Sequence, residues 1–161
     1  MASASENDEA AFHKEECRFY RNEWPEKDEL VIVEIQNVNE DGAYVRLLEY
    51  NNREALILAS SVTRKRVKNV KKILKLGTQD CMQVISVDKE GGFIDLSKRT
   101  VQSIDVEVRK KEFDKAKIVH LIMRLTALNL KIKLIDCYEK FGWDLYDQYE
   151  HAHDALKLAL T

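Results

Sequence analysis

The chain has 161 residues, of which 45% are hydrophobic and 34% are charged, and its formal net charge is −2. This length allows one domain or two small ones, and the composition is typical of a globular protein. Between Arg64 and Lys75 there are 7 basic residues and no acidic one, which leaves 19 basic against 28 acidic residues elsewhere. The charge excludes a uniformly basic nucleic-acid-wrapping protein and indicates one basic patch on an acidic body.

Three cysteines, Cys17, Cys81 and Cys137, are widely spaced and odd in number. This spacing matches neither a disulfide framework nor a zinc site, so we expect reduced thiols and no metal. No apolar run approaches the roughly 20 residues of a membrane helix, and the N-terminus lacks the apolar core of a signal peptide. We therefore expect a cytoplasmic protein without membrane contact.

Residues 1–16 are small, polar and acidic, and we expect them to be a disordered leader. Residues 17–27 contain three aromatic residues, so we expect this arm to dock on the body of the protein. Strand-like segments follow, separated by turn signals such as Asn39–Gly42 and Asp88–Gly92: residues 30–35, 43–48, 55–58, 81–87 and 93–97. They predict a five-stranded β-barrel of the OB type over residues 17–100, with a basic loop at 59–76.

Residues 101–161 are rich in helix formers and lack proline, and they predict an all-α helical domain. Phe113, Ala116, Met123 and Ala127 recur at helical spacing. Gly142 predicts a helix stop. We expect Trp143, just beyond it, to anchor the core of this domain, and Cys81 and Cys137 to be buried small apolar side chains.

The basic loop places one hydroxyl, Thr63, in front of a dense cationic run. Such a run suits phosphate oxygens on a nucleic acid or on a phosphorylated side chain, and basophilic kinases read it. The candidate RNA- or partner-binding residues are Arg64, Lys65, Arg66, Lys68, Lys71 and Lys72. Apolar residues at near-helical spacing (Val62, Val67, Val70, Ile73 and Leu74) predict a short helix with its apolar side on the barrel. The alternative interpretation is that the cationic run is a solvent-exposed charged surface that binds neither RNA nor a partner.

Barrels of this type bind single strands by stacking bases on exposed aromatic rings. Tyr44 and Phe93 are the candidates, although an aromatic residue in the position of Phe93 more often belongs to the core. Leu58 occupies a position where many such domains carry a histidine, which weakens general single-strand binding. The sequence contains no glycine-rich phosphate loop and no catalytic constellation, so we expect neither GTP binding nor enzymatic activity.

Several ungapped blocks carry a family resemblance. Residues 17–20 read CRFY, residues 42–52 read GAYVRLLEYNN, and residues 87–99 read VDKEGGFIDLSKR. The pieces around Gly42, Gly77 and Ile94 resemble RNA-binding barrels named after ribosomal protein S1. All the blocks, with residues 113–119 and the segment at Trp143, resemble the alpha subunits of eukaryotic translation initiation factor 2 from about residue 17 to the end.

This resemblance implies a non-enzymatic subunit without a cofactor. Such a subunit helps deliver initiator methionyl-tRNA to the small (40S) ribosomal subunit in a GTP-dependent ternary complex. The implied partners are the beta and gamma subunits, initiator tRNA, mRNA, the 40S subunit, a guanine-nucleotide exchange factor and regulatory protein kinases. The family's C-terminal gamma-binding domain is absent here, so we expect an N-terminal fragment whose helical domain is truncated at its end.

By resemblance, the family's regulatory phosphorylation site falls on Thr63, where the family usually has serine. Phosphorylation there inhibits the exchange factor. Ser61 and Ser60 are fallback acceptors. The family's kinase-docking element corresponds to Gly91, Gly92, Phe93, Ile94 and Asp95. Gly91 and Phe93 replace the family's usual lysine and tyrosine, which weakens the expected docking.

Two other interpretations remain open from the sequence. One is a generic S1-type RNA-binding module. The other is a pseudosubstrate decoy, which would bind the kinase without accepting phosphate. The helical domain argues against the decoy, because a decoy needs only the barrel.

Overall fold

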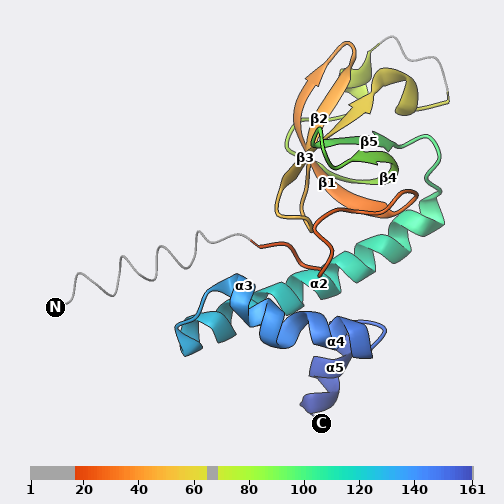
Figure 1. Ribbon diagram of the computed structural model, residues 1–161. Coiled ribbons are helices and arrows are strands. Elements are labelled where there is room, and N and C mark those ends of the chain that lie inside the picture. The colour runs from red at the N-terminus through yellow and green to blue at the C-terminus, as the bar shows by residue number, and fades with distance from the viewer. Residues whose placement is uncertain (1–16, 65–68, 161) are drawn as a thin grey trace. The chain divides into compact units, whose positions relative to one another are not determined.

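The computed structural model describes residues 17–64 and 69–160 (Figure 1). They form two compact units. Residues 22–113 make up a barrel unit, and residues 17–21 and 114–160 make up a helical unit. Helix α2 (Ser103–Leu130) contributes residues to both. The domain boundary that the sequence predicts at residue 100 remains a prediction. The predicted leader, residues 1–16, lies outside the described residues.

The barrel unit is built from five strands, β1 (Leu30–Asn39), β2 (Gly42–Leu47), β3 (Arg53–Leu58), β4 (Gln79–Asp88) and β5 (Phe93–Ser97). They close in the order β1-β2-β3-β5-β4. The β3–β5 pair is parallel, and the other four pairs are antiparallel. The predicted five-stranded barrel followed by helices is therefore confirmed.

The barrel core is built from apolar side chains of all five strands, and β2 shows the two-residue period of a strand clearly. In β2, Ala43, Val45 and Leu47 are fully buried, whereas Tyr44 and Arg46 between them face outward. The other strands add side chains that are at most 2% exposed: Val31, Ile32, Val33, Ile35, Ile57, Cys81, Met82, Val84, Ile94 and Leu96. Burial of these apolar surfaces is the main force that holds the barrel closed.

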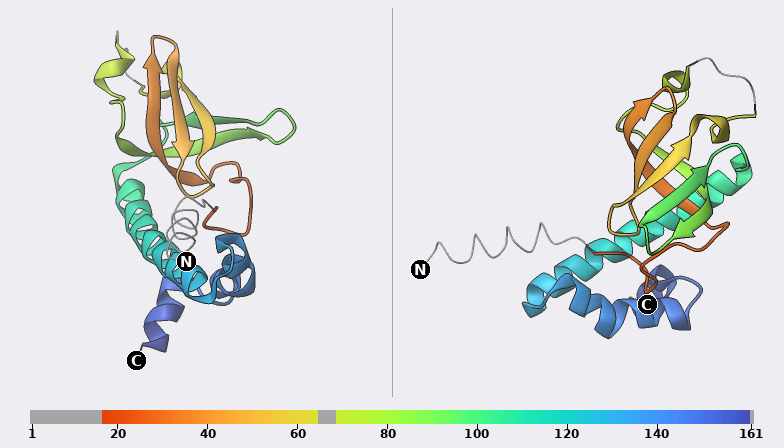
Figure 2. Two further views of the ribbon diagram at one scale, coloured as in Figure 1. Left: turned by 90° about the vertical axis from the view of Figure 1, so that its left-hand side faces the viewer. Right: turned by 45° about the horizontal axis from the view of Figure 1, so that its top comes forward.

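Two register shifts help the sheet to coil into a barrel. One lies in β1 between Ile35 and Asn37, and the other lies in β4 between Val84 and Ser86. Ile85, the extra residue of the second shift, is 42% exposed. Ser86 is thereby set opposite Asp95 of β5. The β4–β5 hairpin extends outward from the barrel (left view of Figure 2).

The core of the helical unit gathers side chains from the second part of α2 and from a helical run over residues 134–148. That run consists of α3 (Leu134–Cys137), a π-helical turn η3 (Tyr138–Gly142) and α4 (Trp143–Gln148). Helix α5 (Ala152–Ala159) follows. Trp143 is 2% exposed, and its indole N–H donates to the carbonyl of Phe19 at 3.2 Å. Its predicted role as a core anchor is confirmed.

Gly142 does not stop a helix, so that prediction is wrong. Its backbone is α-helical, and the helix continues directly into α4. A Cβ at this position would lie 2.6 Å from the ring of Tyr138 and 3.2 Å from the sulfur of Met123. Glycine is therefore required by close packing on the ring of Tyr138, which is fully buried.

All three cysteines are buried thiols that are not paired in disulfides with one another. Burial raises the pKa of the Cys81 thiol to about 11, which disfavours the reactive thiolate. Cys81 and Cys137 are small buried apolar side chains, as predicted. Among residues 17–64 and 69–160, no helix is both long and apolar enough to cross a membrane.

Candidate functional site

The basic loop joins β3 to β4, and the structure describes its two ends. The first end holds a 3-10 turn, η1 (Ala59–Ser61), followed by Thr63 and Arg64. The second end holds another, η2 (Val70–Lys72). The predicted binding residues Lys65, Arg66 and Lys68 lie outside the described residues, as does Val67.

The first end of the loop is fastened to the end of β5. The carbonyl oxygen of Ser61 accepts hydrogen bonds from the amides of Lys98 (2.9 Å) and Arg99 (3.1 Å). It also accepts one from the hydroxyl of Ser97 (3.2 Å). Val62, which follows, is 3% exposed. Thr63 is thereby presented at a fixed point of the barrel surface, partly exposed, with Arg64 exposed beside it.

The second end of the loop has an apolar side and a cationic side. Val70 and Leu74 are buried, whereas Lys71, Lys72 and Lys75 are exposed. The Asn69 side chain begins the turn by accepting a hydrogen bond from the Lys71 amide at 3.0 Å. The predicted arrangement, apolar side inward and cationic side outward, is confirmed for these residues, although the helical part is a single 3-10 turn over Val70–Lys72.

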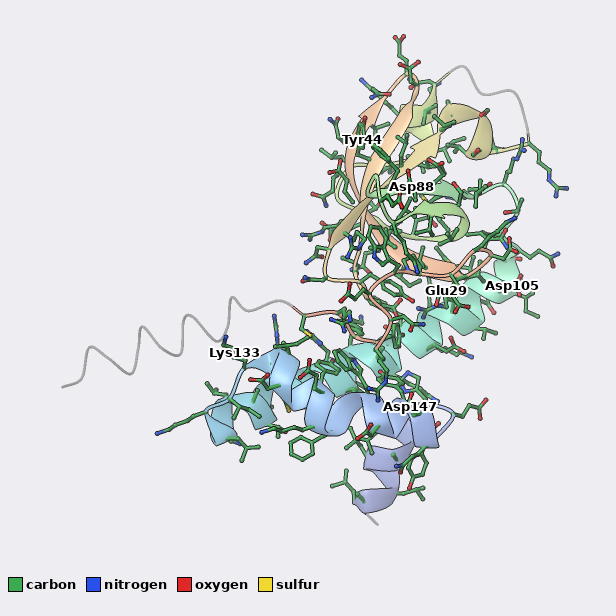
Figure 3. The ribbon with its side chains drawn as sticks, in the orientation of Figure 1. Glu29, Tyr44, Asp88, Asp105, Lys133 and Asp147 are labelled. Atoms are coloured by element: carbon green, nitrogen blue, oxygen red, sulfur yellow. The ribbon has the colours of Figure 1, made fainter. Side chains whose placement is uncertain are left out.

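A second candidate surface is a groove of about 460 Å³ on the outside of the barrel. Its lining includes two aromatic rings, Tyr44 and Phe93, which are 42% and 68% exposed. The remaining lining residues are Glu54, Ala55, Leu56, Ser86, Asp88, Gly92, Ile94 and Asp95. Figure 3 labels Tyr44 and Asp88 on the barrel. The expectation that Phe93 belongs to the core is wrong, because Ile94 turns inward instead and is 1% exposed.

Sheet register builds this groove from residues far apart in the sequence. Tyr44 of β2 lies opposite Leu56 of β3, and Leu56 lies opposite Asp95 of β5. Asp95 in turn lies opposite Ser86 of β4, whose hydroxyl donates to the Asp95 carboxylate at 2.9 Å. The groove therefore runs across four strands, which is why a linear reading of the sequence did not find Leu56 and Ser86.

The predicted docking element divides between this groove and the turn before it. Gly91 and Gly92 close the hairpin, since their amides donate to the side chain and the carbonyl of Asp88 at 3.0 and 2.8 Å. Gly92 has a φ of +77°, a conformation that favours glycine. Of the following residues, Phe93 and Asp95 are exposed in the groove, whereas Ile94 is buried.

The charge of the groove distinguishes it from a nucleic-acid platform. Three carboxylates line it, those of Glu54, Asp88 and Asp95, and none of the described lysines or arginines is among the lining residues. Carboxylates repel the phosphates of a nucleic acid, and the favourable contacts in such complexes come from basic side chains. The aromatic face therefore suits a protein partner better than a single strand, and the described cations of the basic loop lie outside the groove.

Comparisons with known proteins agree with the two-part architecture. The family model of the S1 RNA binding domain matches residues 24–99. An Arabidopsis thaliana eukaryotic translation initiation factor 2 subunit alpha homolog is 44% identical over 146 residues. Subunit 1 of the same factor from Dictyostelium discoideum is 41% identical over 151 residues. Each match covers 91% of this chain, which spans 42% and 44% of the two relatives, less than half their length.

Solved structures are similar over both units. The intact alpha subunit of aIF2 from Pyrococcus abyssi has a TM-score of 0.79 at 28% identity, and the match covers 86% of this chain and 53% of that one. The a/eIF2alpha–aDim2p–rRNA complex from Pyrococcus horikoshii OT3 has a TM-score of 0.74 at 29% identity, covering 84% and 81%.

Proposed function

Because the chain belongs to the family of the alpha subunits of eukaryotic translation initiation factor 2, we propose that it acts as a translation initiation factor subunit. In this role it helps deliver initiator methionyl-tRNA to the 40S ribosomal subunit within a GTP-dependent ternary complex. It has no catalytic activity of its own and needs no cofactor. The beta and gamma subunits belong to the same complex.

Regulation acts through Thr63. A protein kinase transfers the γ-phosphoryl group of ATP to Oγ1 of Thr63, with loss of the hydroxyl proton and release of ADP. The product carries about −1.5 to −2 charges at neutral pH, set among cations of the basic loop. The observation that carries this proposal is the position of Thr63, a partly exposed residue two positions beyond Ser61, whose carbonyl is hydrogen-bonded to residues 97–99. The modified loop then inhibits the guanine-nucleotide exchange factor.

The groove provides a docking surface for the kinase, away from the residue that is modified. Its exposed rings offer apolar area, and its carboxylates offer acceptors for basic side chains of the partner. Phe93 and Asp95 are the docking residues, whereas Gly91 and Gly92 shape the turn. Ile94 does not contact the kinase directly, because its side chain is buried; it packs in the barrel core and supports the strand that carries Phe93 and Asp95.

Initiator tRNA and mRNA contact the cationic loop. Among the described residues, Arg64, Lys71 and Lys72 are exposed and available to phosphate oxygens. Lys65, Arg66 and Lys68 complete the run in the sequence. A simple S1-type RNA-binding module is the second candidate function. The match of residues 24–99 to the S1 family favours it, as does the rRNA in the Pyrococcus horikoshii complex.

The proposal is tested by incubating the chain with a kinase of this pathway and ATP, followed by mass-spectrometric mapping of the phosphate. We expect incorporation at Thr63 and none in Thr63→Ala. Thr63→Ser is the positive control, because it lacks the methyl group that crowds the acceptor oxygen. Incorporation that is unchanged in Thr63→Ala would assign the site to Ser61 or Ser60 and refute the role of Thr63.

A further inference from the structure

The side chain of Arg99, just beyond β5, reaches back to the start of the basic loop. Its Nη1 donates to the carbonyl oxygen of Ser60 at 3.3 Å, and its own amide donates to the carbonyl of Ser61 at 3.1 Å. The guanidinium is exposed and carries five N–H donors, of which this contact uses one. Donors remain for another acceptor on the same side of the turn.

Thr63 follows the short helical stretch of backbone that contains Ser60. Residues 59–61 form η1, the Val62 amide donates to the Ala59 carbonyl, and Val62 itself is in the α-helical region. Thr63 directly follows Val62, the last residue with this helical backbone, and Arg99 is already bound to the backbone of the same turn.

We propose that Arg99 binds the phosphoryl group once Thr63 is phosphorylated. This inference rests on the modification proposed above. Arginine suits the task because its planar guanidinium donates two parallel hydrogen bonds to phosphate oxygens, which a lysine ammonium cannot do. Arg64, adjacent in the sequence and exposed, supplies a second positive charge.

The consequence is that the phosphate is held by the barrel rather than by the loop alone. Arg99 follows Ser97 and Lys98, which also bind the Ser61 carbonyl, so the phosphate would join an existing set of contacts. A phosphate on Thr63 then adds charge-assisted hydrogen bonds between the loop and the end of β5. A protein that binds the phosphorylated loop would then find the phosphate held in one position by Arg99.

The test is a 31P NMR titration of the chain with phosphothreonine installed at position 63 by synthesis, so that no kinase is needed. A guanidinium beside the phosphate favours the dianion and lowers its second pKa. We expect that pKa to be lower in the phosphorylated chain than in its Arg99→Gln variant by about one unit. Lys89→Gln is the matched control, since it removes the same charge from the β4–β5 turn and leaves the value unchanged.

Equal pKa values in the phosphorylated chain and in Arg99→Gln would overturn the proposal, provided that the 1H–15N spectrum shows both folded. The spectrum checks this because the backbone bonds of Arg99 and Lys98 to Ser61 do not depend on the replaced side chain. A kinase that ignores Thr63 would refute the proposed modification and leave this titration unaffected, so the two failures are distinguishable.

Discussion

Arg109 on helix α2 forms an ion pair with Glu49, whose side chain is only 1% exposed. The Nε of the same guanidinium donates to the Leu30 carbonyl at 2.9 Å. This contact ties the start of α2 to the segment after β2 and to the first residue of β1. Removing one partner of a buried pair leaves an uncompensated charge.

We therefore expect Arg109→Met to lower the free energy of unfolding of the barrel unit by about 3–5 kcal/mol, measured by urea denaturation. The double variant Arg109→Met/Glu49→Gln removes the stranded charge and should recover part of this loss. A cost below about 1 kcal/mol for the single variant would show that the pair contributes no more than an exposed one.

His120 makes the helical unit sensitive to acid. Its ring stacks on Phe19 with centroids 4.3 Å apart, and its Nδ1 lies 2.6 Å from the hydroxyl of Tyr138. Burial, with a smaller contribution from Arg124, lowers the His120 pKa to about 4. The unfolded chain, with an ordinary histidine pKa of about 6.5, binds the proton more readily. Stability is therefore fully present above pH 6.5 and is lost as the pH falls toward 4.

Between pH 7 and pH 5, this histidine should cost the helical unit about 2 kcal/mol of unfolding free energy. The fluorescence of Trp143 in a Trp24→Phe background reports on this unit. His120→Gln, which does not titrate, should lose correspondingly less over the same range. The same pH dependence in both proteins would assign the acid sensitivity to other groups.

The cationic loop should govern the salt dependence of RNA binding. We expect the double variant Lys71→Ala/Lys72→Ala to reduce the slope of log K against log salt by about one unit per lost phosphate contact. Initiator tRNA is the probe, and binding is measured over a range of salt concentrations. Lys27→Ala/Lys89→Ala removes the same charge from residues outside the basic loop and is the control. If both double variants have equal slopes, the loop makes no specific contribution.

The groove should affect kinase recognition without altering the fold. Phe93 is 68% exposed, so Phe93→Ala removes little packing, and Asp95→Asn keeps an oxygen for the Ser86 hydroxyl. We expect either change to raise the KM for phosphorylation of Thr63 by about tenfold, the loss typical of an anchoring side chain. Ile85→Ala, an exposed change outside the groove, is the control. An unchanged KM would place docking elsewhere.

The barrel could be predicted from the sequence because its five apolar, strand-like segments are separated by turn signals, and burial in β2 and β3 follows the two-residue period. The position of Phe93 could also have been predicted, because it shares a strand face with the charged Asp95 and not with Ile94. Two other features could not be predicted from the sequence. The groove depends on the parallel pairing of β3 with β5, which brings Leu56 beside Asp95. The role of Gly142 depends on the ring of Tyr138 that packs against it.

The basic loop was also only partly predictable from the sequence. A run of cations following one hydroxyl was visible in the sequence as a site for phosphate chemistry. The hydrogen bonds that fasten Ser60 and Ser61 to residues 97–99 were not visible, because they join segments nearly forty residues apart. Those hydrogen bonds attach the start of the basic loop to the barrel, two residues before Thr63.

Phosphate on Thr63 is expected to change the affinity of the exchange factor for this chain. The most direct measurement is the affinity of purified exchange factor for the kinase-treated chain, for the untreated chain and for kinase-treated Thr63→Ala. We predict that the phosphorylated chain binds at least about tenfold more tightly than either control, equivalent to about 1.4 kcal/mol. Equal affinities for all three would contradict the account.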